Sequence, residues 1–364
     1  MFAATQGGTQ KDSSKYFEDV TEFHEIDVVT TRGDAVESLH RVHAAVVNGD
    51  DTLLGSAGDS SLVTFWRSCA KPFQIIPLLE GGGFDAHQWG DEELALACAS
   101  HGGEPEHVAI VEAMLQTLGL EEGDLACGPQ EPLSARGARF VRESGIRIKR
   151  THNNCSGKHT AMLSLAQHGG SPIRGYERAE HPVQQAMLNQ VALWTGVPTS
   201  RIDVAVDGCG AAVFGIPLEM MARAYARLGR AASRGEEIPA RITSAMARNA
   251  FLIGGTDRFD SVLIEESEGR IISKIGAEGI HSALILDSSI GIAVKVEDGN
   301  QRAQFPALIQ VLQNLGALPQ DLPPRLAEFK RRPLRNTRNE VIGDVMMLTE
   351  FGSDARRTAA VAAF

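Results

Sequence analysis

The spacing of apolar and polar residues changes twice along the chain and divides it into three parts. In the first part, apolar β-branched runs are separated by the turn-forming residues 48–51, which is typical of antiparallel strands. In the middle part, apolar residues recur at helical spacing, and Pro182 and Pro217 stand where the first turn of a helix tolerates proline. After Gly254-Gly255 the strand pattern returns.

The pattern places each expected element at approximate bounds. Strands are expected at 26–30, 36–47, 52–54, 261–264, 271–275, 282–286 and 291–296. Helices are expected at 72–99, 105–118, 157–167, 182–195, 217–228, 238–252 and 303–315.

Strands at both ends and helices in the middle predict an α+β fold. The N-terminal and C-terminal strands are expected to join one antiparallel sheet, and the central helices to form a second lobe. Residues 1–22, rich in Gly, Gln, Ser, Lys and Asp, are expected to form a mobile tail, and residues 23–364 a single two-lobed catalytic domain. Its sheet lobe would take about 23–67 and 258–364, and its helical lobe about 68–257. A cleft between the lobes is the expected place for a site.

The charge and the cysteines restrict the class of partner and the compartment. A formal net charge of −11 argues against nucleic acid or an anionic membrane surface as the main partner. No run approaches the ~18 apolar residues that a membrane span needs, and the first ten residues lack the apolar core of a secretory signal. Five dispersed cysteines then favour free thiols or metal ligands over disulfides. We therefore expect a cytoplasmic protein.

The segment 67–72, RSCAKP, lies where the strand pattern changes to the helical one. Ser68 and Lys71 are three residues apart, so a helical turn would place both side chains on one face. A serine hydroxyl is a weak nucleophile that needs a base, and a lysine can act as one when burial or a nearby cation lowers its pKa. Alone, this short pattern is also compatible with an unremarkable helix start.

Two further segments match the same chemistry. Ser100 follows a predicted helix, and Lys274-Ile275-Gly276 lies on a predicted strand, close to the K-T-G pattern of serine β-lactamases. The order of the three motifs resembles the β-lactamase and penicillin-binding architecture, although Gly102 stands where the middle motif of that fold has Asn.

Two cysteines and a lysine form a second constellation. Cys155 and Lys158 are three residues apart before a helical run, and Cys209 lies in a glycine-flanked turn after Asp207. Two thiolates and a third donor suit a zinc ion with an open fourth position. The spacing alone favours small buried thiols over a metal site.

Together these blocks resemble the rhizobial-type asparaginases, the asparaginase II family, from about residue 23 to residue 315. The resemblance is carried by the blocks 37–47, 67–72, 98–101, 154–159, 207–209 and 274–279. It implies a fold like that of serine β-lactamases and glutaminases, and a homodimer. It also implies the hydrolysis of L-asparagine to L-aspartate and ammonia.

The resemblance also implies residue roles. Ser68 with Lys71, and Ser100 with Lys274, would be the catalytic pairs. Cys155, Lys158 and Cys209 would bind Zn²⁺, which would mainly position the substrate. The expected substrate-binding residues are Asp207, Arg67, His101 and Ala277, with the Asp207 carboxylate on the α-ammonium group of asparagine.

In the expected mechanism, Lys71 activates Ser68, and backbone N–H groups of Ser68 and Ala277 hold the oxyanion. The loop 254–260 departs from the family pattern, which can carry a cysteine near Asp260, and Asn153 stands where the family can have Ser. Three alternatives remain open: a glutaminase or β-lactamase-like enzyme, a non-catalytic zinc or amino-acid binding protein, and a structural protein.

Overall fold

The computed structural model describes residues 21–22 and 26–352 and has an α+β architecture. The expected tail lies outside the described residues, except that Thr21–Glu22 form the short strand β1. The other strands are β2 (Val28–Arg32), β3 (Ala35–His40), β4 (Val42–Val47), β5 (Leu53–Ala57), β6 (Val63–Phe65), β7 (Asp203–Val206), β8 (Ala212–Pro217), β9 (Ile271–Ile275), β10 (Ile280–Ile285), β11 (Ile290–Val296), β12 (Arg332–Arg335) and β13 (Val341–Met347).

The α-helices follow the expected bounds over much of the chain. They are α1 (Lys71–Gln74), α2 (Ile76–Glu80), α3 (Gly83–Ala86), α4 (Asp91–Cys98), α5 (Pro105–Thr117), α6 (Ala135–Ser144), α7 (Ser156–His168), α8 (Pro182–Thr195), α9 (Leu218–Ser233), α10 (Glu237–Arg248), α11 (Ala250–Gly254), α12 (Phe259–Glu266), α13 (Gln301–Asn314), α14 (Pro324–Lys330) and α15 (Leu348–Gly352). No helix among the described residues is long and apolar enough to cross a membrane.

The main sheet joins the two ends of the chain, as expected. Its strand order is β1-β5-β4-β11-β10-β9, so the N-terminal hairpin β4–β5 pairs with the C-terminal strand β11. The expectation of one sheet was too simple. A four-stranded sheet, β12-β13-β2-β3, and a three-stranded sheet, β6-β8-β7, are also present in the described part of the chain. Only Arg41 separates β3 from β4, so the predicted strand 36–47 is divided between two sheets.

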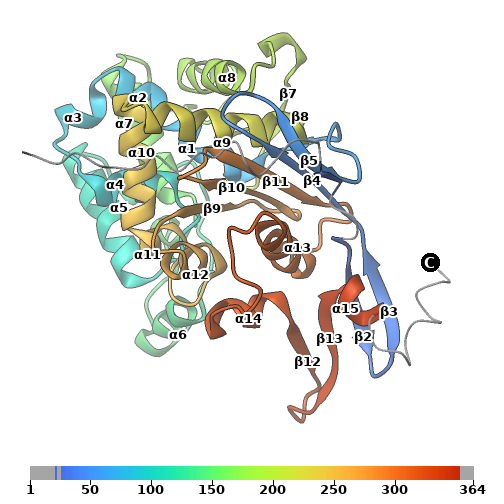
Figure 1. Cartoon of the computed structure of the whole chain (residues 1–364). Coiled ribbons are helices and arrows are strands. Elements are labelled where there is room, and N and C mark those ends of the chain that lie inside the picture. The colour runs from blue at the N-terminus through green and yellow to red at the C-terminus, as the bar shows by residue number, and fades with distance from the viewer. Residues whose placement is uncertain (1–20, 23–25, 353–364) are drawn as a thin grey trace, which may run out of the picture.

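Helices cover both faces of the main sheet (Figure 1). Helix α9 packs on β4, β10 and β11, and α13 lies on the opposite face. The strands alternate accordingly: Ala45 and Val47 of β4 belong to the apolar core on the α9 side, whereas Ala44 and Val46 belong to the core on the α13 side. At Gly291 of β11 a Cβ atom would lie 2.0 Å from a carbonyl oxygen of α9, so the close contact requires glycine.

Two of the sequence predictions were wrong in detail. The expected helix 72–99 is four short helices, because Pro77 and the glycines 81–83 interrupt it, and Gly82 has a left-handed φ of 73°. The expected strand 261–264 is part of helix α12, because a short apolar run fits a buried helix as well as a buried strand.

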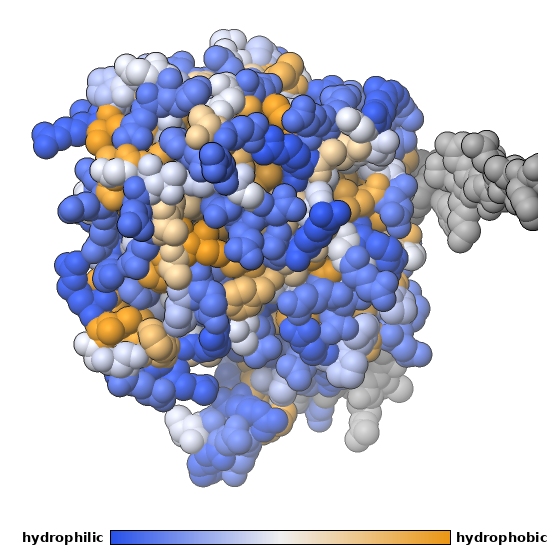
Figure 2. Space-filling view, turned by 90° about the vertical axis from the view of Figure 1, so that its left-hand side faces the viewer, coloured by the Kyte–Doolittle hydropathy of each residue, from blue (hydrophilic) through white to orange (hydrophobic). Residues whose placement is uncertain are grey.

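On the side of the molecule that carries α3, α4 and α5, hydrophilic residues dominate and apolar ones form separate groups (Figure 2).

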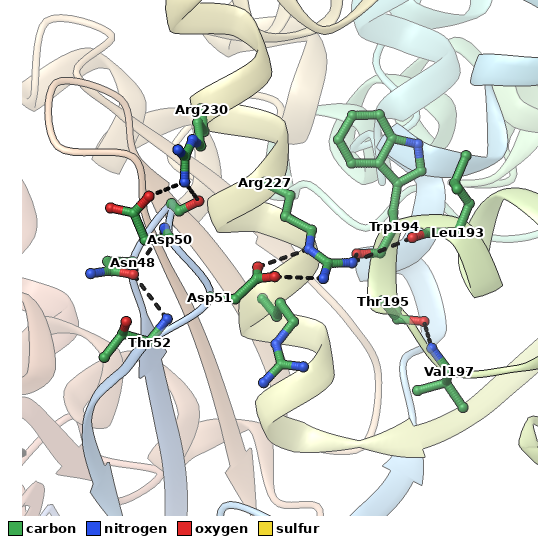
Figure 3. Close-up of polar contacts among 12 residues, drawn as sticks. Asn48, Asp50, Asp51, Thr52, Leu193, Trp194, Thr195, Val197, Arg227 and Arg230 are labelled. Atoms are coloured by element: carbon green, nitrogen blue, oxygen red, sulfur yellow. Dashed lines mark hydrogen bonds and ion pairs between the residues drawn. The ribbon is translucent and has the colours of Figure 1, made fainter.

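Arg227 of α9 connects the β4–β5 turn to the end of α8 (Figure 3). Its Nε and one terminal nitrogen donate to the two Asp51 oxygens at 2.8 and 2.6 Å, and the other terminal nitrogen donates to the carbonyl oxygens of Trp194 and Leu193. One planar guanidinium thus satisfies acceptors from two separate elements.

We predict that Arg227→Lys lowers the free energy of unfolding by about 1 kcal/mol, because an ammonium group cannot form the paired bonds and the site is partly exposed. This corresponds to a fall of about 2 °C in Tm, measured by calorimetry. The matched control is Arg178→Lys, because Arg178 is 77% exposed and its ion pair is 3.9 Å long. Equal Tm changes in the two variants would contradict a special role for Arg227.

Candidate functional site

The segment carrying Ser68 is fixed where β6 meets the short 3-10 helix Arg67–Ala70. Trp66 is fully buried, stacks on Phe73 at 4.9 Å and donates its indole N–H to the hydroxyl of Ser282. Arg67 adopts a left-handed φ of 52°, which is uncommon for a residue with a Cβ atom. The apolar anchor holds this turn, and it thereby orients the residues that follow.

Two lysine amines converge on the hydroxyl of Ser100. Lys71 Nζ lies 3.1 Å and Lys274 Nζ lies 2.7 Å from Ser100 Oγ. Lys71 comes from α1, Lys274 from β9, and Ser100 from the segment after α4. Both lysines are fully buried, and Ser100 is 2% exposed. The structure therefore brings together three expected site residues that are distant along the chain.

The two amines differ in their hydrogen bonds. Lys71 donates to the carbonyl oxygens of Ala99 and Asn154 as well as to Ser100, so it has acceptors for all three N–H bonds of an ammonium group. Lys274 has two acceptors, Ser100 and the carbonyl oxygen of Ile275. Burial, together with the neighbouring Lys71 charge, lowers the pKa of Lys274 to about 8. Lys274 is consequently the amine better suited to act as a base.

The expected direct pairing of Ser68 with Lys71 is not found. No hydrogen bond joins the Ser68 side chain to another residue of the described chain, and Lys71 is directed to Ser100 instead. The spacing of three does place both residues on one short helical segment. Ser68 is partly exposed, unlike Ser100. The segment is also tied to β9, because the Cys69 thiol donates to the carbonyl oxygen of Lys274 at 3.0 Å.

Arg67 and Asp207 form an ion pair next to Ser68. The guanidinium donates to one Asp207 oxygen from Nε at 2.8 Å and from a terminal nitrogen at 2.7 Å. Burial would raise the pKa of Asp207, but the charges of Lys158 and Arg67 outweigh burial and hold it below its usual value. The carboxylate is therefore ionised at neutral pH and can pair with a cationic group.

His101 and Ala277, both expected to bind substrate, lie in different environments. His101 is fully buried; its Nδ1 accepts the N–H of Gly103, so its Nε2–H donates to the Ser156 hydroxyl at 2.9 Å. With both nitrogens used inside the protein, His101 supports the start of α7 and has no free polar atom for a substrate. Ala277 is partly exposed in the turn after β9 and follows Gly276, where a Cβ atom would lie 3.1 Å from the Cys69 sulfur.

The three expected metal ligands also converge. Lys158 Nζ lies 3.3 Å from Cys209 Sγ, and Cys155, at the N-terminus of α7, hydrogen-bonds to Cys209. The hydrogen bond from Cys155 and the charge of Lys158 lower the pKa of Cys209 well below its usual value, despite burial. Burial alone would lower the pKa of Lys158, but the neighbouring Cys209 and Cys155 sulfur groups outweigh burial and raise this pKa.

This donor set fits a zinc ion. Sulfur and nitrogen ligands of a tetrahedral zinc ion lie about 3.5 Å apart, close to the separation seen here. Zinc would have to displace the Lys158 proton, as metals do with their ligands. Among the described residues no group of three or more His, Cys, Asp and Glu is arranged for a metal ion, so the lysine is needed to complete the set.

The sequence did not reveal every contact of the site. The carbonyl oxygens of Ala99 and Asn154 hold Lys71, and backbone acceptors leave no signal in residue types. Asp260 lies buried behind Lys274 and bonds to the backbone N–H of Ile275 at 2.9 Å. Its departure from the expected loop pattern was the one signal that could have identified it.

The comparisons with known proteins identify the family of the chain. The chain belongs to the L-asparaginase II family, whose model matches residues 28–347. The family is one of amidohydrolases, which places the chain among amide-hydrolysing enzymes. No curated protein matches the chain.

Two solved structures are similar to the chain at low identity. One, from Bacteroides dorei DSM 17855, is provisionally described as a β-lactamase; the match covers 75% of this chain and 94% of that one, with 10% identity and a TM-score of 0.42. The other is a β-lactamase from Mycobacterium bovis, with the same coverages, 12% identity and a TM-score of 0.39. Similarity at this level says nothing about activity.

We predict that Cys155→Ser and Cys209→Ser each lose most of the zinc that the unmodified chain retains after dialysis, because each variant replaces a soft thiolate ligand with a hydroxyl. Atomic absorption gives the zinc-to-protein ratio. Cys98→Ala, at a fully buried cysteine of α4, is the control and should keep its zinc. Unchanged zinc in the two serine variants would exclude this site.

Proposed function

We propose that the protein hydrolyses the side-chain amide of L-asparagine to L-aspartate and ammonia. The family membership and the two buried lysine amines at the Ser100 hydroxyl support this proposal. The second observation carries it, because a buried amine in hydrogen-bonding reach of a serine can take up and return the proton that amide hydrolysis transfers.

Recognition of the substrate is assigned to the Arg67–Asp207 pair. The ionised Asp207 carboxylate would bind the α-ammonium group of asparagine through a charge-assisted hydrogen bond. Arg67 contacts the same carboxylate and lies directly before Ser68, so it would bind the α-carboxylate close to the attacking group.

Ser68 is assigned as the nucleophile. It is the partly exposed serine and has an unengaged hydroxyl, whereas Ser100 is buried between the lysines. Ser68 attacks the amide carbonyl, and its proton passes through Ser100 to the neutral amine of Lys274. The backbone N–H groups of Ser68 and Ala277 would stabilise the oxyanion.

The proton then leaves with the product. Lys274, now an ammonium group, returns the proton through Ser100 to the departing nitrogen, which is released as ammonia. Water hydrolyses the acyl-enzyme by the same route in reverse. Lys71, with its three acceptors, holds Ser100 in place.

Zinc is proposed as a positioning cofactor held by Cys155, Lys158 and Cys209. When bound, it would supply a fixed positive charge beside the substrate. The charge of Lys158 already acts on Asp207, so the metal site and the recognition pair are electrostatically connected. No step of the proton transfer depends on the metal.

We predict that Ser68→Ala and Lys274→Met each reduce kcat for ammonia release from asparagine by about 10⁴-fold, because nucleophile and base act as one unit. Ser144→Ala, at an exposed serine at the end of α6, is the control and should keep full activity. Glutamine is assayed in parallel to define the substrate. Retention of a tenth of the activity by Ser68→Ala would reject Ser68 as the nucleophile.

A second prediction concerns pH. The pKa of Lys274 is about 8, and the base must be neutral, so kcat/KM should rise with pH up to about 8 and fall at higher pH, where the α-ammonium group of asparagine loses its proton. This is checked by measuring initial rates of ammonia release from about pH 6 to about pH 10, which spans about two pH units on either side of the Lys274 pKa. A profile already level at about pH 6 would assign the base to another group.

A further inference from the structure

A fully buried carboxylate lies directly behind the strand that carries Lys274, and the mechanism above does not use it. Asp260 lies in the first turn of α12 and is 2% exposed. One of its oxygens accepts the backbone N–H of Ile275 at 2.9 Å, and the other accepts the Ser273 hydroxyl at 2.7 Å. These two donors flank Lys274 on either side along β9.

A histidine and a glutamine complete the network around this carboxylate. Gln304 Nε2 donates to His281 Nδ1 at 3.1 Å, so the other ring nitrogen, Nε2, carries the hydrogen. That N–H faces the Ser273 hydroxyl at 2.8 Å and an Asp260 oxygen at 3.1 Å. Burial would raise the pKa of Asp260, but His281 and the other donors hold it well below its usual value. The group is therefore an anion at neutral pH.

We propose that Asp260 is a positioning residue for Lys274. Its hydrogen bonds fix β9 next to the lysine, and its negative charge counteracts the effect of the positive Lys71 on the Lys274 amine. This proposal rests on the assignment of Lys274 as the base. It extends that assignment, because it names the buried charge that sets the proton affinity of the base.

Among the other ionisable groups around Lys274, none is proposed to supply a free negative charge next to its amine. Lys71 faces the amine from α1, and Cys69, Cys98 and Cys155 face it from the 3-10 helix Arg67–Ala70, α4 and the start of α7. The pKa of each of these cysteines is raised to about 12, mainly by burial, or for Cys155 first by its hydrogen bond with Cys209. The Cys69 and Cys98 thiols are thus neutral at pH 7, and a Cys155 thiolate would be bound to the proposed zinc ion.

The groups around Asp260 itself are few. Besides Lys274 and His281, they are Arg258 from the start of α12, Cys69, and Tyr225 from α9. Burial raises the pKa of Tyr225 well above its usual value, so this phenol is neutral as well. Removal of the Asp260 charge should therefore act on Lys274 without compensation from another anion of this group.

The test is the substitution Asp260→Asn. The amide oxygen can still accept the Ile275 N–H, and its NH₂ group can donate to Ser273, so the charge and the contact with the His281 N–H are lost while the bonds to β9 are kept. Without the anion the Lys274 ammonium is less stable, and the rising limb of kcat/KM should move to lower pH by about one pH unit. The same shift is expected in the ¹³Cε NMR titration of Lys274, which does not depend on turnover.

The matched control is Ser273→Ala, which removes a hydrogen bond of the network and retains the charge. This variant should have a lower Tm, and the rising limb of its kcat/KM profile should stay at the original pH. If Asp260→Asn does not fold, Asp260→Ser, which leaves room for a water molecule at the Ile275 N–H, is expected to show the same downward shift.

The outcomes separate this inference from the proposed function. If a folded Asp260 variant without the charge keeps the limb at the original pH, while Lys274→Met is inactive, the inference is overturned and the base assignment stands. If Lys274→Met stays active, the base assignment itself fails, and the inference fails with it.

Discussion

The whole site depends on two positive charges that are forced close to one hydroxyl group inside the protein. Lys71 and Lys274 are fully buried and both contact Ser100, so two full ammonium charges would repel each other strongly in a medium of low polarity. The protein resolves this conflict unequally. Lys71 has a hydrogen-bond acceptor for each N–H bond of an ammonium group, whereas burial and the Lys71 charge lower the pKa of Lys274 to about 8. In the proposed mechanism Lys274 is the amine that acts as the base.

The rest of the fold keeps this unequal pair in place. The turn that carries Ser68 is anchored by the buried ring of Trp66 and tied to β9 through the Cys69 thiol. Helix α9 packs so closely on the main sheet that β11 needs glycine at position 291. The two amines and the Ser100 hydroxyl are thus held by rigid elements from three distant parts of the chain, which suits a reaction that requires fixed distances.

The sequence predicted the class of fold and most of the elements, because their spacing is a local property. It also predicted Lys71, Ser100 and Lys274 as site residues, and their convergence is observed. It expected Lys71 to pair with Ser68, whereas the hydrogen bond observed is to Ser100, since a spacing of three shows that two side chains share a face and does not show which distant acceptor will reach one of them. For the same reason Asp260 was noticed only as a departure from a pattern, and helix α12, which carries it, was expected to be a strand.

The order of the strands in the main sheet has a consequence for biosynthesis. The hairpin β4–β5 leaves the ribosome early, but its sheet neighbour β11 and the strand β9 with Lys274 follow more than two hundred residues later. The intervening helices can begin to pack before then, whereas the open edge of β4 must wait for its partner. Lys274 is therefore made long after the segments that carry Ser68 and Ser100, and a nascent chain interrupted before β9 would carry both serines without the Lys274 amine.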